Sequence, residues 1–201
     1  MGISMHVIGI TGGVGSGKTE ILHIIEKHCN CRILYGDEIA HQVKEPGGVC
    51  YSELVSLLGK DVLNEDGSIK KNKMAEMIFQ NDNLLIKVNQ LIHPAVKKVI
   101  QGIIEEENKQ GKLSWLFIEA ALLIEDGYDA ICDELWYIHT DEEIRRERLK
   151  TSRHYSDEKI TDIMKKQKKK EEFEKFCSFI IENNGSIEET KKQIITKLEE
   201  A

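Results

Sequence analysis

Two hydrophobic patterns alternate along the chain: short, nearly continuous apolar runs, and longer stretches with an apolar residue at every third or fourth position. The short runs predict buried parallel strands, and the longer stretches predict amphipathic helices. The five predicted strands are Val7 to Ile10, Cys31 to Leu34, Leu113 to Glu119, Glu134 to His139 and Phe179 to Glu182. Helices between successive strands predict an α/β fold with a doubly wound, five-stranded parallel sheet.

The segment 45–112 departs from this alternation, because it shows helical patterns without a strand between them. The predicted helices cover Tyr51 to Leu58, Lys71 to Phe79 and Leu84 to Glu107, and residues 64–67 (Asn-Glu-Asp-Gly) predict a turn. Proline disfavours helical geometry in the residue before it, so Pro94 predicts a break or kink near His93. We interpret 45–112 as a helical insertion that binds a second substrate.

Highly charged helical patterns follow the fourth strand, over Asp141 to Lys150 and Asp157 to Phe176. They predict a helical lid over about 141–176. One domain then spans residues 1–201, with a core at about 5–44, 113–140 and 177–201. The last part of the core ends in an amphipathic helix, Ile187 to Leu198.

Composition narrows the function classes. The net charge of −7 argues against a large nucleic-acid interface. No apolar stretch approaches the ~20 residues that span a bilayer, and the N-terminus lacks a signal-peptide pattern, so we expect no membrane association. The five cysteines show neither disulfide nor zinc spacing, which indicates reduced structural thiols in a cytoplasmic protein. We expect a monomer or a weak homo-oligomer.

The first predicted strand leads directly into a glycine-rich stretch that matches G-x-x-x-x-G-K-[ST] from Gly12 to Thr19. Glycines let the backbone approach a phosphate, and the following helix presents its N-terminus to the anion. Lys18 is expected to reach the β- and γ-phosphates, and the Thr19 hydroxyl to bind Mg²⁺. The alternative is a glycine-rich turn before a helix cap. The predicted ATP-binding residues of the loop are Gly13, Val14, Gly15, Ser16, Gly17, Lys18 and Thr19.

Two acidic residues stand at the carboxyl ends of predicted strands, where open α/β sheets bind their ligands. Asp37 follows the second strand and could face the phosphate loop; its alternative is a helix N-cap. Glu119 ends the third strand, where an acid helps to hold Mg²⁺ in phosphate-loop proteins.

The lid carries Arg145, Arg146 and Arg148 and a run of lysines between 165 and 170. Such charge runs are typical of solvated helix faces. Phosphoryl transfer also needs cations near the migrating group, so one lid arginine or lysine could be catalytic instead.

Several segments together resemble the dephospho-coenzyme A kinase family. They are GITGGVGSGKT, GDEIAHQVKEPGG, LNEDGSI, IHPAV, ALLIE, RERL, Gln167 and IIENNG, in this order along nearly the whole chain. The resemblance implies a phosphate-loop kinase fold with a helical substrate-binding part and a lid. It also implies transfer of the γ-phosphoryl group of ATP, with Mg²⁺, to the ribose 3′-hydroxyl of dephospho-coenzyme A.

The resemblance further implies roles for individual residues. Asp37 would accept the proton of the 3′-hydroxyl, and His93 would position the hydroxyl donor or make a structural hydrogen bond. Lys18 and Arg148 would be catalytic with Asp37, and Lys170 would supply a positive charge to the substrate from the lid. Arg153, Asn183 and Asn184 would bind the nucleotide, the two asparagines in a loop that borders the adenine.

The chain also departs from the family pattern. The family has other residue types at five positions, namely Glu20, Tyr35, Ala121, Lys170 and Phe173. Lysine at a lid position offers a point charge without the bidentate fork of arginine. These departures leave two alternatives: a kinase of another small alcohol, nucleoside or nucleotide, and a non-enzymatic nucleotide-dependent switch. The guanine-reading Asn-Lys-x-Asp and the Asp-x-x-Gly switch motifs of GTPases do not occur.

Overall fold

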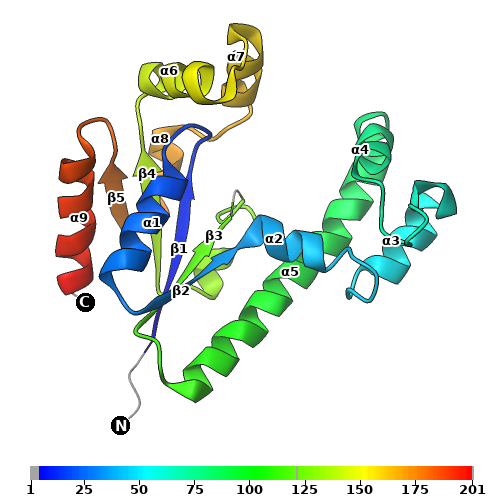
Figure 1. The fold of residues 1–201 in the computed structure, drawn as a ribbon, viewed down its shortest axis with the longest axis horizontal. Coiled ribbons are helices and arrows are strands. Elements are labelled where there is room, and N and C mark those ends of the chain that lie inside the picture. Colours follow the sequence, from blue (N-terminus) through cyan, green and yellow to red (C-terminus); the bar gives the residue numbers. More distant parts are fainter. Residues whose placement is uncertain (1–4, 121, 201) are drawn as a thin grey trace. The chain divides into compact units, whose positions relative to one another are not determined.

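The five predicted strands all form, and together they build one sheet in the computed structural model, which describes residues 5–120 and 122–200 (Figure 1). The departure noted at Ala121 lies outside the described residues. The sheet order is β2-β3-β1-β4-β5, and the pairs β1–β3, β1–β4 and β4–β5 are parallel. The strands are β1 (His6–Gly12), β2 (Cys31–Tyr35), β3 (Trp115–Glu119), β4 (Glu134–His139) and β5 (Phe179–Glu182). The predicted α/β fold class is confirmed.

The chain divides into two compact units, one with residues up to Leu34 and from Glu106 onward, the other from Tyr35 to Glu105. The first unit holds the sheet, and the second is helical. The second unit contains α2 (Gly36–Gln42), α3 (Tyr51–Leu58), a 3-10 turn (Lys60–Val62), α4 (Lys71–Phe79) and most of α5 (Asp82–Gln110). The predicted turn forms, because the N–H of Gly67 donates to the carbonyl of Asn64. The boundary predicted for the insertion, 45–112, stays a prediction.

Side chains on both faces of the sheet are covered by helices of the first unit. On one face, the rings of Trp115, Phe117, Trp136 and Phe179 lie in a row, with centroids 5.1–6.4 Å apart. Here α1 (Lys18–His28) packs against α9 (Ile187–Glu199), which also contacts β5. On the other face, Phe173 of α8 (Lys170–Phe173) stacks on Tyr137.

Of the break or kink predicted near His93, the break does not occur, and the kink stays a prediction. Helix α5 runs through Pro94 without interruption over 29 residues. A proline inside a helix costs about 3 kcal/mol, because it removes one backbone hydrogen bond and crowds the preceding turn. The buried side chains Val88, Ile92, Val96 and Ile100 continue a single apolar stripe across that point. Each contributes roughly 1.5–3 kcal/mol by burial, so packing outweighs the local penalty.

The lid also differs from its prediction in one place. Helix α6 (Glu142–Arg153) forms as expected and ends where His154 adopts a left-handed conformation (φ 52°). The second predicted helix, Asp157 to Phe176, is instead α7 (Asp157–Lys165) and the short α8. The interruption falls in the run of lysines, where like charges repel along a helix face. The carboxylate of Glu172 then accepts from the N–H of Lys169 (3.0 Å) and starts α8.

Candidate functional site

The glycine-rich loop connects β1 to α1 with the backbone geometry that its sequence predicts. Gly15 and Gly17 have φ of 81° and 91°, a left-handed conformation that favours glycine. Gly17 is the N-cap residue of α1, so the helix begins at Lys18 and directs its free N–H groups toward the loop. The loop therefore presents backbone donors and a helix N-terminus, the combination that binds phosphate.

The backbone carbonyl of Ser16 links the loop to three side chains outside it. It accepts hydrogen bonds from Asn183 Nδ2 (2.8 Å), Thr140 Oγ1 (3.0 Å) and Arg148 Nη1 (3.4 Å). Asn183 is 5% exposed, and its Oδ1 accepts from the buried Thr190 hydroxyl (2.9 Å). These contacts place the Asn183 side chain behind the loop, and its predicted contact with adenine stays a prediction.

Lys18 and Glu119 lie together at the carboxyl ends of neighbouring strands. Lys18 Nζ donates to the Gly12 carbonyl (2.7 Å) and lies 3.8 Å from Glu119 Oε1. The β1–β3 register explains this proximity, because Glu119 is paired with Ile10, two residues before Gly12. Thr19 is exposed in the first turn of α1. The fold therefore brings together the predicted loop lysine and the acid predicted at the end of the third strand.

Hydroxyl and carboxylate oxygens are suitable ligands for Mg²⁺, so Thr19 and Glu119 fit that ion. Within residues 5–120 and 122–200, no three acidic, histidine or cysteine side chains form a complete metal site. This is compatible with Mg²⁺, which usually takes one or two protein ligands and keeps the rest for water and phosphate oxygens.

Arg145 is a site residue that sequence analysis did not single out. Its Nε donates to the Val14 carbonyl (2.8 Å), its Nη2 donates to Gln167 Oε1, and its guanidinium lies against Gly13. Burial lowers the pKa of the Arg145 guanidinium. Its three-residue separation from Arg148 was a usable signal, since such residues share one helix face.

The other lid cations have different surroundings. Arg148 Nη2 donates to the Asn183 carbonyl (3.1 Å), and Arg153 is exposed in the last turn of α6. Lys170 forms an ion pair with Glu182 (2.9 Å), and this hydrogen bond raises the Lys170 pKa. The roles predicted for these residues stay predictions.

Two of the family departures have a structural explanation. Phe173 is buried, and its ring stacks on Tyr137 with centroids 4.3 Å apart and planes 8° apart, so this position belongs to the core. Glu20 is exposed in the first turn of α1, where the helix dipole stabilises a negative charge.

Two predicted site residues lie in the helical unit. Asp37 is exposed in the first turn of α2, directly after β2. His93 is half-buried in α5, one residue before Pro94. Burial and the nearby Lys71 lower the pKa of Lys44, while Asp37 opposes this shift. A partly buried amine and an exposed carboxylate therefore share one region of this unit.

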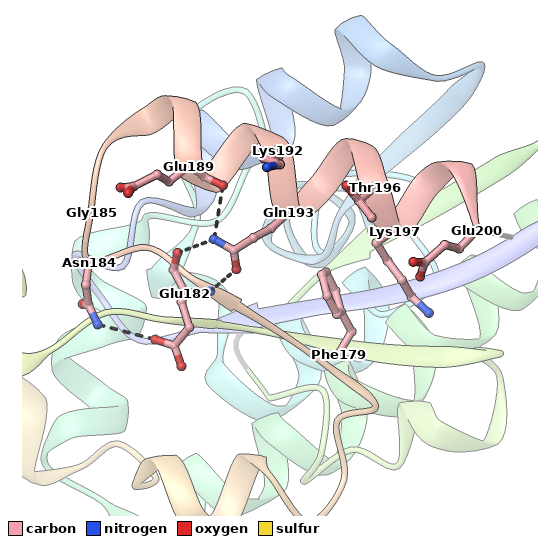
Figure 2. Close-up of a pocket in the computed structure, with 10 residues that line it drawn as sticks. All are labelled: Phe179, Glu182, Asn184, Gly185, Glu189, Lys192, Gln193, Thr196, Lys197 and Glu200. Carbon is pink, nitrogen blue, oxygen red and sulfur yellow. Dashed lines mark hydrogen bonds between the residues drawn. The ribbon is translucent and has the colours of Figure 1, made fainter.

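Figure 2 shows a groove of about 600 Å³ along the edge strand β5 and helix α9. The side-chain amide of Gln193 donates to the Glu182 carbonyl (2.9 Å) and accepts from its N–H (3.0 Å). Gln193 thus satisfies backbone groups that an edge strand would otherwise expose. Of the predicted site residues only Asn184 lines this groove, and its Oδ1 accepts from the Asp141 N–H (2.7 Å). The groove is distinct from the phosphate loop.

Comparison with known proteins gives a consistent family match. The model of a family described as dephospho-CoA kinase matches residues 6–189. The dephospho-CoA kinase of Carboxydothermus hydrogenoformans is 33% identical over 96% of this chain and 93% of its own length. That of Dehalococcoides mccartyi is 32% identical over 96% and 97%. A structure titled dephospho-CoA kinase from Campylobacter jejuni matches the fold with a TM-score of 0.74 at 20% identity, over 98% of this chain and 97% of the other.

Proposed function

We propose that this chain, which belongs to the dephospho-coenzyme A kinase family, transfers the γ-phosphoryl group of ATP to the ribose 3′-hydroxyl of dephospho-coenzyme A. The products are coenzyme A and ADP, and the reaction is the last step of coenzyme A synthesis. The observation that carries this proposal is the family match, because it spans the phosphate loop and the whole helical unit. The enzyme is a kinase, and ATP is its phosphoryl donor.

We assign ATP binding to the loop residues Gly13 to Thr19. Backbone N–H groups and the Lys18 ammonium would hold the β- and γ-phosphates, because their positive charge faces the anion. Thr19 and Glu119 would hold Mg²⁺, which when bound neutralises charge on the phosphate oxygens. The separation of 3.8 Å between Lys18 and Glu119 supports a shared role at one end of the triphosphate.

We assign activation of the acceptor to Asp37. The exposed carboxylate of Asp37 would accept the proton that the 3′-hydroxyl loses as it attacks phosphorus. His93 would orient the acceptor from α5, and Lys170 would supply positive charge from the lid. Arg148 would be catalytic from the lid, and Arg153, Asn183 and Asn184 would bind the nucleotide. Since phosphoryl transfer passes through a loose transition state, positioning and electrostatics would supply most of the rate enhancement.

We also infer the surroundings in which the enzyme works. All five cysteines are free thiols, the state that a reducing compartment maintains, which supports the cytoplasm. Within the described part of the chain, no helix has both the length and the apolar character needed to cross a bilayer. The negative net charge supports a small-molecule acceptor over nucleic acid, and a monomer or weak homo-oligomer stays a prediction.

The test measures ADP release from ATP with and without dephospho-coenzyme A. We expect release to depend on that acceptor. Turnover with another alcohol or nucleoside alone would identify a different kinase, and nucleotide binding without transfer to any acceptor would indicate a switch.

Asp37→Asn tests the assignment of the base. We expect kcat to fall by about 10²-fold or more, the range for loss of a general base, while ATP binding is retained. Glu38→Gln is the matched control, because Glu38 is the next residue of α2 and is equally exposed. A near-normal kcat in Asp37→Asn would remove Asp37 from the catalytic role.

A further inference from the structure

Four of the twelve lysines and arginines of the lid form an ion pair with a carboxylate. Arg146 pairs with Glu142 (2.7 Å), and Lys150 pairs with Asp157 (2.7 Å). Lys168 and Lys170 form further pairs with acids outside α6 and α7. These ion pairs reduce the charge that each cation could offer to a bound phosphate.

Arg145 differs from these cations. It is partly buried, and no carboxylate among the described residues forms an ion pair with it. Burial of a charge is costly, and it lowers the pKa of the Arg145 guanidinium even though the nearby Tyr137 and Glu142 oppose this shift. A ligand with negative charge would remove that cost.

The contacts of Arg145 direct it at the phosphate loop. Nε is bound to the Val14 carbonyl, and Nη2 is bound to Gln167 from the α7–α8 connection. A guanidinium has five N–H donors, so these two bonds leave about three of them available. The Arg145 guanidinium also occupies the space in which a side chain at position 13 would lie. Because residue 13 is glycine, the guanidinium can lie against the loop backbone.

Arg148, the arginine that sequence analysis favoured, faces a different part of the loop. Its guanidinium donates to the carbonyls of Ser16 (3.4 Å) and Asn183 (3.1 Å), both of which belong to the support behind the loop. Carbonyl partners leave its charge intact but direct its donors away from Gly13 and Val14.

We propose that Arg145 is the lid residue that contacts the β- and γ-phosphates of ATP. This assignment rests on the proposed function and adds a catalytic residue to it. As the acceptor oxygen bonds to the γ-phosphorus, the bond from that phosphorus to the β–γ bridging oxygen breaks. The bridging oxygen keeps the electron pair and becomes a terminal oxygen of ADP. Arg145 exchanges no proton; its planar fork stabilises the negative charge on the equatorial and bridging oxygens.

The test compares Arg145→Gln with Arg145→Lys and with Arg146→Gln. Arg146 is the matched control, because it is the next residue of α6 and pairs with Glu142 and Thr161 away from the loop. For Arg145→Gln we expect kcat to fall by about 10²–10³-fold, the range for one lost transition-state donor. Arg145→Lys should recover part of this loss, and Arg146→Gln should behave as the wild type.

Titration with ATP and with ADP separates phosphate contact from a structural role. A γ-phosphate contact weakens ATP binding more than ADP binding in Arg145→Gln, whereas a distorted loop weakens both equally. Equal weakening, or an unchanged kcat, overturns the proposal. Because this titration needs no acceptor, it stands even if dephospho-coenzyme A proves not to be the substrate.

Labelling of the wild-type protein tests the contact without any variant. Phenylglyoxal modifies arginines, and mass spectrometry locates the product. We expect ATP to protect Arg145 more strongly than ADP does, while the exposed Arg32 of β2, which has no proposed role, is modified regardless of the nucleotide. Modification of Arg145 at the same rate with and without ATP overturns the proposal.

Discussion

Asn183 carries more of the stability of the phosphate loop than its place in a polar loop suggests. Its amide joins the carbonyl of Ser16 to the buried hydroxyl of Thr190 by bonds of 2.8 and 2.9 Å. In Asn183→Ala both bonds are lost. Thr190 then keeps only its longer hydrogen bond to the carbonyl of Ser186 (3.3 Å). Each lost hydrogen bond contributes about 0.5–1.5 kcal/mol, and truncation of the buried side chain leaves a cavity, so we expect a loss of roughly 2–4 kcal/mol.

Urea and thermal unfolding measure this loss. For a chain of this size, each 1 kcal/mol lowers the Tm by about 2–4 °C, so we expect a decrease of roughly 4–16 °C. ATP affinity should fall as well, because Ser16 loses one of its three hydrogen-bond donors.

Two further variants sharpen this measurement. Asn183→Asp keeps the volume and the bond from Thr190 but turns an acceptor toward the Ser16 carbonyl, so it should also be destabilised. Asn184→Ala is the control for stability, because Asn184 is more exposed and water can replace its bond to Asp141. Melting of both Asn183 variants within about 1 °C of the wild type would refute the reasoning.

Two predictions concern the core beneath the lid. Phe173→Ala should lower the free energy of unfolding by about 3–5 kcal/mol, because it removes the ring stacked on Tyr137. Phe176→Ala is the control and should change this free energy little, because the Phe176 side chain is 52% exposed. Similar urea midpoints for the two variants would contradict the packing. Burial raises the pKa of Cys177 from 9.0 to about 11, so the unfolded chain loses this proton first as the pH rises. The contribution of Cys177 is therefore complete below pH 9 and falls by about 2–3 kcal/mol as the pH approaches 11. The stability of the wild type should fall more steeply across this range than that of Cys177→Ala, and parallel curves would disprove the shift.

The central strands β1, β3 and β4 could be predicted from sequence because they are buried on both faces. Continuous apolar runs such as Glu134 to His139 have no other stable environment, and two predicted strands match the observed bounds residue for residue. The phosphate loop could also be predicted from sequence, because its backbone conformation at Gly15 and Gly17 requires glycine.

Non-local packing explains why the break predicted at Pro94 does not occur, and local charge explains the divided helix of the lid. Pro94 is a helix breaker by local rules, yet the apolar stripe from Val88 to Ile100 holds α5 together across it. The local pattern between Asp157 and Phe176 is helical, but the lysine run and the start that Glu172 gives to α8 divide it.

Sequence analysis named Lys18, Glu119 and Asn183 as site residues and did not single out Arg145, and the long-range contacts of Asn183 and Arg145 do not follow from a local pattern. Lys18 and Glu119 meet because their strands are neighbours. Arg145 lies 131 residues from Val14 in sequence, so this contact could not be predicted locally, although the spacing from Arg148 places both arginines on one helix face. Asn183 likewise bonds to a carbonyl 167 residues away.

The central claim is the identity of the acceptor, and ³¹P NMR of the reaction products tests it directly. With ATP and dephospho-coenzyme A, the account predicts loss of the γ-phosphate signal and the appearance of one phosphomonoester at the ribose 3′-position, in a one-to-one ratio with ADP. Inorganic phosphate as the only new signal, or an unmodified 3′-hydroxyl after ATP is consumed, would contradict it.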